Sequence, residues 1–131
     1  MFLSNLSIKE QYFFLELADK LIHLDGESRV SEQALFSSYI TEMGLTKDYE
    51  IQGIDTETIL NSITTSQIQK IIYIELLALC NIDLDFNIKE KEFMRQIAVG
   101  FNLPHAFIIN CELWIKEINN CYKKGYSLIF S

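Results

Sequence analysis

The chain has 131 residues, of which 49% are hydrophobic, and a formal net charge of −7. This length suits a single folded domain over residues 1–131, and the apolar content excludes a disordered chain. The acidic balance argues against a nucleic-acid binder, because neutralising phosphates requires clustered lysines and arginines. One proline and five glycines leave little room for a turn-rich β protein, so we expect long helices.

The first expected helix begins at Ser7, which has capping-box spacing to Glu10. Its apolar stripe consists of Phe14, Leu17, Ala18, Leu21 and Leu24. A second helix is predicted from near Ser31 to Met43, and Gly44 suits its C-terminal cap. The stripe of that helix consists of Leu35, Phe36, Tyr39, Ile40 and Met43.

A short third helix is expected over 55–63, with Ile59, Leu60 and Ile63 facing inward. The spacing of Ser66 and Gln69 predicts a second capping box, which opens a helix that is apolar almost all round. Such a helix belongs at the centre of a bundle. Glu75 lies on it, and we expect this carboxylate to be half-exposed or paired with a lysine, the alternative being a role shared with the acidic turns.

A fifth helix carries Phe93, Ile97, Ala98 and Phe101. Pro104 suits the first position of a sixth helix, and Gly125 is expected to end it. The seam of this helix consists of Phe107, Cys111, Trp114, Ile118 and Cys121. The apolar C-terminal segment "GYSLIFS" is expected to pack back on the bundle, the alternatives being an interaction surface or an oligomer contact.

An internal repeat links segments 17–45 and 75–103 with a constant offset of 58 residues. The offset pairs Leu21 with Leu79, Asp25 with Asp83, Glu27 with Asp85, Glu32 with Glu90, and Leu45 with Leu103. Two such helix–turn–helix hairpins should pack on each other, because neither buries its apolar face alone. The expected fold is a compact all-α bundle of about six helices, built from two related hairpins and a long C-terminal helix.

The stretches "FLSNLSIKEQYFFLELADKLIHLDGE", "ITEMGL" and "IELLALCNIDLDFNIKEKEFMRQIA" resemble the TerB-like family of tellurite-resistance proteins. The family pattern is an apolar helix ending in Ala-Asp-Gly-Glu or similar, an aliphatic residue and an acidic helix start, given twice. The resemblance covers residues 5–125 and implies a non-enzymatic protein of bacterial stress-response or phage-defence systems. This chain departs from the pattern where Ser28 and Arg29 precede Val30, and where the second turn lacks the glycine.

The acidic turns admit two interpretations. As a metal site they offer carboxylates suited to Ca²⁺, Mg²⁺ or Mn²⁺. As helix caps they complement the positive end of the helix dipole. An EF-hand does not fit, because Ile88 and Met94 stand where that loop needs glycine and glutamate. The candidate cation ligands are Asp25, Glu27, Glu32, Asp83, Asp85 and Glu90.

No catalytic motif is present in the sequence. Cys80, Cys111 and Cys121 lack C-x-x-C spacing and are expected to be buried free thiols. His23 is expected to end the first helix and His105 to be exposed at the start of the sixth. Without a signal sequence or an apolar stretch long enough to span a bilayer, the chain is expected to be cytoplasmic.

The expected function is a non-catalytic interaction or sensor module with an unidentified protein partner. The alternative is a divalent-cation-binding domain that uses the acidic turns. Homo-oligomerisation is compatible with both.

Overall fold

The computed structural model describes residues 1–24, 32–45, 49–80 and 87–131, and within them it contains helices and no strands. The predicted all-α bundle is therefore confirmed. No helix in these ranges is both long and apolar enough to cross a membrane. The elements are the 3₁₀ turn η1 (Leu3–Asn5) and the helices α1 (Ile8–Ile22), α2 (Glu32–Met43), α3 (Thr56–Ser62), α4 (Ser66–Cys80), α5 (Ile88–Gly100) and α6 (His105–Phe130).

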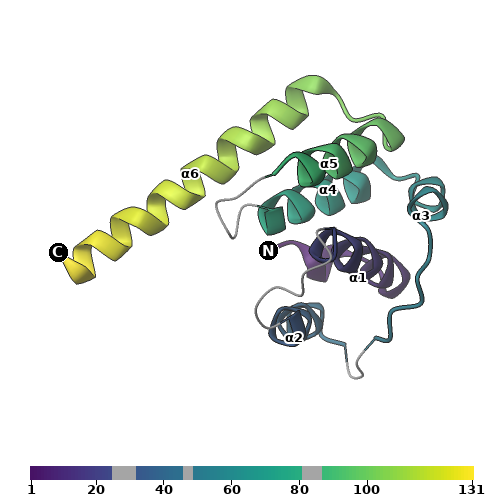
Figure 1. Ribbon diagram of the computed structural model, residues 1–131, viewed down its shortest axis with the longest axis horizontal. Coiled ribbons are helices and arrows are strands. Elements are labelled where there is room, and N and C mark those ends of the chain that lie inside the picture. The colour runs from purple at the N-terminus through teal and green to yellow at the C-terminus, as the bar shows by residue number, and fades with distance from the viewer. Residues whose placement is uncertain (25–31, 46–48, 81–86) are drawn as a thin grey trace.

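Helix α4 lies at the centre of the bundle, as its apolar sequence predicts. It contacts α1, α5 and α6, while α2 packs on α1 and η1, and α3 packs on α5 (Figure 1). The hairpins α1–α2 and α4–α5 therefore meet through their first helices. The fully buried side chains of these two helices include Phe14, Leu17, Ile72 and Leu76.

The 58-residue offset recurs in the structure. Helices α1 and α4 begin 58 residues apart and have 15 residues each. Helices α2 and α5 end with the same backbone geometry, since Gly44 and Asn102 have φ of +72° and +52°. The next residues, Leu45 and Leu103, donate their N–H groups to carbonyls five residues earlier. This closure is a Schellman motif, which requires a left-handed residue at the turn.

The N-terminal caps match the sequence prediction at one helix and not at the other. Ser7 and Glu10 form the expected capping box, with bonds of 3.3 Å and 2.7 Å. Ser66 is instead the first residue inside α4, and the Gln69 side chain donates to the Ile63 carbonyl at 2.8 Å. The predicted second capping box is therefore wrong, because Gln69 satisfies a carbonyl at the end of α3.

Helix α6 is longer than the sequence predicted. It follows Pro104, which is its N-cap, and continues through Gly125 to Phe130. A single glycine costs a helix only about 1 kcal/mol relative to alanine, and the residues beyond Gly125 keep the helical pattern. The expectation that "GYSLIFS" packs back on the bundle is also wrong, since this segment extends away from the other helices (Figure 1).

Candidate interaction site

The predicted cation ligands fall largely outside the described residues. Asp25, Glu27, Asp83 and Asp85 lie there entirely, and Glu32 opens α2 with its side chain outside them. Glu90 is described: it lies in the first turn of α5, is only 2% exposed, and donates its N–H to Asn87 Oδ1 at 2.9 Å. Asn87 is therefore the cap of α5. Over the described ranges, no three His, Cys, Asp or Glu side chains come together as a metal site would require.

A buried carboxylate that the sequence analysis missed lies on α1. Glu16 is 1% exposed and accepts hydrogen bonds from the Tyr49 hydroxyl at 2.6 Å and the Gln52 and Ile54 N–H groups at 2.8 and 3.0 Å. Burial raises the pKa of Glu16, but these hydrogen bonds outweigh it and lower the pKa below its ordinary 4.5. All of these donors belong to the segment between α2 and α3, so Glu16 holds that segment in place.

Glu75 has a different partner from the one expected. It is 5% exposed and accepts from the Phe2 N–H at 2.6 Å, and its Oε1 lies 3.0 Å from the Met1 amino group. Glu42 binds the same amino group at 2.8 Å. Burial lowers the pKa of this amino group, but its bonds to the two carboxylates outweigh that effect and raise the pKa above 8.0. The expected half-exposure or lysine partner is therefore wrong.

The thiols and imidazoles lie where the sequence predicts, with one exception. Cys80 and Cys111 are buried as predicted, whereas Cys121 is exposed, which corrects the third assignment. Burial raises the pKa of the Cys111 thiol to about 11, so this thiol is protonated at neutral pH. His23 caps the end of α1, and His105 is exposed at the start of α6, both as expected.

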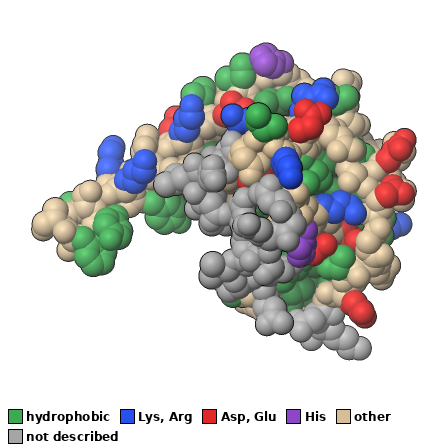
Figure 2. Space-filling view, viewed as in Figure 1, with side chains coloured by type: hydrophobic (Ala, Val, Ile, Leu, Met, Phe, Trp, Pro, Cys, Tyr) green, Lys and Arg blue, Asp and Glu red, His purple; other side chains and the backbone are tan. Residues whose placement is uncertain are grey.

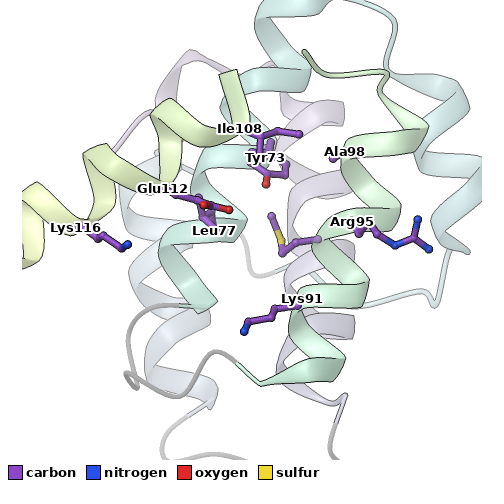
Figure 3. Close-up of a pocket in the computed structure, with 9 residues that line it drawn as sticks. Tyr73, Leu77, Lys91, Arg95, Ala98, Ile108, Glu112 and Lys116 are labelled. Carbon is purple, nitrogen blue, oxygen red and sulfur yellow. The ribbon is translucent and has the colours of Figure 1, made fainter. Parts of the chain in front are cut away.

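A cavity of about 400 Å³ lies between α4, α5 and α6 (Figure 3). Lys91 and Lys116 extend toward each other at its edge, whereas Arg95 points away from them and pairs with Glu92 at 2.7 Å. Its floor includes Tyr73, Leu77 and Met94, which are at most 3% exposed. The cavity therefore has a mostly apolar lining with charged side chains at its edge.

The largest exposed apolar surface in the described ranges lies on the second half of α6. Within this helix only Cys111 and Ile115 are buried, and both belong to its first half. Beyond them the helix extends away from the body of the protein, which the other helices form. This half carries hydrophobic side chains along one edge and lysines along the other (Figures 1 and 2). The exposed fractions are 76% for Tyr122, 66% for Tyr126, 86% for Leu128, 74% for Ile129 and 68% for Phe130.

We call the apolar face of this half the α6 stripe. At 100° per residue most of its members fall within an arc of about 140°, which also contains the buried Cys111 and Ile115. The stripe therefore continues the face that packs on the body, but nothing in the described part of the chain covers it. A hollow of about 680 Å³ lies along it. The stripe residues that line the hollow are Trp114, Ile118, Cys121, Tyr122, Gly125, Tyr126 and Ile129. The exposed Leu128 and Phe130 flank these residues on either side and complete the stripe.

A longer view of the sequence pattern would have found this stripe. The spacing of Ile118, Tyr122, Gly125 and Ile129 is helical, and an isolated glycine in such a pattern is tolerated. Treating Gly125 as a helix end concealed the continuation.

No family model, no curated protein and no solved structure matches the chain. Among the described surfaces, the α6 stripe is the one whose exposure demands an explanation, because contiguous apolar surface in contact with water is unfavourable.

Proposed function

We propose that this chain is a non-catalytic interaction module of the TerB-like type, which acts in the cytoplasm of a bacterium as part of a stress-response system. The α6 stripe is its docking surface. The observation that carries the proposal is the exposure of Tyr122, Leu128 and Ile129, each at least 74%, on one face of a regular helix. With about 150–250 Å² for a whole aromatic side chain, Tyr122, Tyr126 and Phe130 alone present roughly 400 Å². Apolar patches of this size mark binding surfaces.

The body serves as a platform that holds the helix ready for binding. The first half of α6 is anchored by Cys111 and Ile115, which are buried, and the Trp114 ring lies 6.0 Å from the Phe2 ring. Since the second half already has helical geometry, a partner does not have to bear the entropic cost of ordering its backbone. This arrangement favours a partner that binds the amphipathic helix α6 in an apolar groove or against a helix of its own.

The duplicated hairpin supports the TerB-like type. Its two copies share helix positions and the Schellman closure at Gly44 and Asn102. In this account the hairpins form the platform and α6 makes the contact with the partner.

Affinity purification from the organism of origin tests the proposal, with quantitative mass spectrometry of what is retained. The stripe variant Tyr122→Asp/Ile129→Asp should lose the wild-type partner. The matched control is Asn120→Asp/Ser127→Asp, which adds the same two charges to the opposite, exposed face of the same helix. The control should retain the partner. Identical partners for all three proteins would contradict a docking role for the stripe.

A second candidate function is divalent-cation binding, and the burial of Glu90 favours it. This carboxylate is 2% exposed and follows the second acidic turn in the sequence, where hard cations would find oxygen ligands. An ion at about 100 times its dissociation constant should add roughly 2.7 kcal/mol to the free energy of unfolding. Thermal unfolding of metal-stripped protein with Ca²⁺, Mg²⁺ or Mn²⁺ measures this, with Asp25→Asn/Glu27→Gln and Glu90→Gln as variants. No shift for any ion would contradict the candidate.

A further inference from the structure

We infer that the occupant of the α6 stripe is a second copy of this chain, and that the two α6 helices pair in antiparallel orientation. The inference rests on the proposed function, which makes the stripe the docking surface, and adds the identity of the partner. Two-fold pairing through one shared patch is the commonest way in which identical chains associate.

The dimensions of the stripe fit a helix. From Trp114 to Ile129 it covers 15 residue steps, or about 22 Å at 1.5 Å per residue. The hollow of about 680 Å³ is lined by residues from Trp114 to Ile129, so it follows the same length of the helix. Tyr122, Leu128 and Ile129 lie on or beside the line along which a second helix would pack, and each is at least 74% exposed in the single chain, so pairing would cover them.

The order of side chains along the stripe favours the antiparallel orientation. Ile118 and Gly125 lie seven residues apart, as do Trp114, Cys121 and Leu128, which gives the alternating spacing of four and three typical of a coiled-coil seam. In an antiparallel pair these two sets face each other, so Trp114 of one chain lies opposite Gly125 of the second copy. In a parallel pair glycine faces glycine and tryptophan faces tryptophan, which leaves a void at Gly125 and crowds the helices at Trp114.

Charge complementarity points in the same direction. Glu117 and Lys124 lie seven residues apart on one edge of the stripe. In an antiparallel pair this edge faces the same edge of the second copy, so each Glu117 meets a Lys124 of the other chain. In a parallel pair the edge faces Ile115, Tyr122 and Ile129, which carry no charge. Antiparallel pairing also places the two acidic bodies at opposite ends of the helix pair.

The other occupants fit less well. One alternative is that the C-terminal segment 119–131 binds in the α4–α5–α6 cavity. This segment contains two lysines and no acidic residue, so Lys91 and Lys116 at the edge of the cavity would repel it. An anionic lipid surface would attract Lys123 and Lys124 but repel the rest of a chain whose net charge is −7.

Sedimentation velocity over a range of protein concentrations tests the inference. Wild type and the Asn120→Asp/Ser127→Asp control should dimerise with the same dissociation constant, and Tyr122→Asp/Ile129→Asp should stay monomeric. Because all four substituted side chains are exposed in the single chain, circular dichroism should show that every variant is folded.

Charge reversal tests the orientation. Glu117→Lys alone and Lys124→Glu alone should each weaken the dimer about tenfold, since each turns two attractive contacts into repulsive ones. The double variant Glu117→Lys/Lys124→Glu should restore the wild-type dissociation constant. A dimer without this rescue would overturn the antiparallel pairing.

A wild-type monomer at about 100 µM, well above the usual range for a specific interface, would overturn the inference. So would a dimer that the stripe variant leaves intact, or a monomer that binds vesicles of anionic phospholipid through the stripe. If the wild type is monomeric but loses a different protein partner on the Tyr122→Asp/Ile129→Asp change, the proposed function stands and only the second copy is wrong. If the stripe variant changes neither self-association nor partner retention, both fail.

Discussion

The Tyr49 hydroxyl donates a 2.6 Å hydrogen bond to Oε2 of Glu16, across 33 residues of sequence. The same carboxylate accepts from the Gln52 and Ile54 N–H groups, and Gly53 between them has φ of +73°. Consecutive N–H groups turned inward by a left-handed glycine form a natural anion-binding concavity. Here that concavity is filled by the protein's own Glu16, which ties the connection between the hairpins to α1.

We predict that Glu16→Gln lowers the free energy of unfolding by about 2–3 kcal/mol. The amide would replace a charged acceptor and turn an N–H donor toward a backbone N–H, leaving buried groups unsatisfied. Urea denaturation measures the change. The matched control, Glu50→Gln, lies on the same segment but is exposed, and it should change the free energy by less than about 0.5 kcal/mol. Equal losses of stability in Glu16→Gln and Glu50→Gln would show that the hydrogen bonds to Glu16 contribute nothing specific.

The same carboxylate gives a pH prediction. The pKa of Glu16 is lowered below 4.5 in the folded protein. A group of this kind stabilises the fold above its unfolded-state pKa and loses that contribution as the pH falls through its folded-state pKa. The wild-type advantage over Glu16→Gln should therefore be constant near neutral pH and shrink below about pH 4.5. An advantage that persists unchanged at about pH 2 would contradict this assignment.

Glu75 supports a second stability prediction. Its carboxylate binds the Phe2 N–H and the Met1 amino group, so Glu75→Gln should lower the free energy of unfolding by about 1–3 kcal/mol. Glu112→Gln is the control, because Glu112 is exposed on α6, and it should stay within about 0.5 kcal/mol of wild type. Hydrogen exchange should show faster exchange at Phe2, whose N–H donates to Glu75, in Glu75→Gln and not in the control. Unchanged exchange there would refute the assigned contact.

The paired Schellman turns predict effects of different sign. Gly44 has φ of +72°, and no atom lies within 4 Å of the place that a Cβ would occupy, so Gly44→Ala should cost about 1 kcal/mol from backbone strain alone. Asn102 has φ of +52°, and Asn102→Gly should be neutral or stabilise by up to about 0.5 kcal/mol. Thermal unfolding of both variants checks this. Destabilisation by both substitutions to the same degree would contradict a shared left-handed closure.

The fold was largely predictable because its signals are local. Helix starts at Ser7 and near Asp55, the turn at Gly44 and the inward stripes follow from capping chemistry and helical periodicity. The partners of Glu16 and Glu75 were not predictable. Both are buried carboxylates that bind backbone N–H groups 36 and 73 residues away, and backbone donors leave no trace in a sequence.

The candidate site was only partly predictable. Periodicity identified the seam of α6 from Phe107 to Cys121, but it does not tell a buried stripe from an exposed one, because both have the same pattern. Exposure depends on where the body ends, which is set by the packing of α4 and α5 and the place at which α6 leaves them (Figure 1).

Site-specific photo-crosslinking in the organism of origin tests most directly whether α6 is a docking surface. A photoreactive side chain replaces Ile129 on the stripe, and in the control it replaces Ile88, which is 82% exposed on the body. We expect one discrete, saturable adduct from position 129 and none from position 88, and mass spectrometry of the adduct identifies the partner. The absence of an adduct at position 129, or equal labelling from both positions, would contradict a docking role for α6.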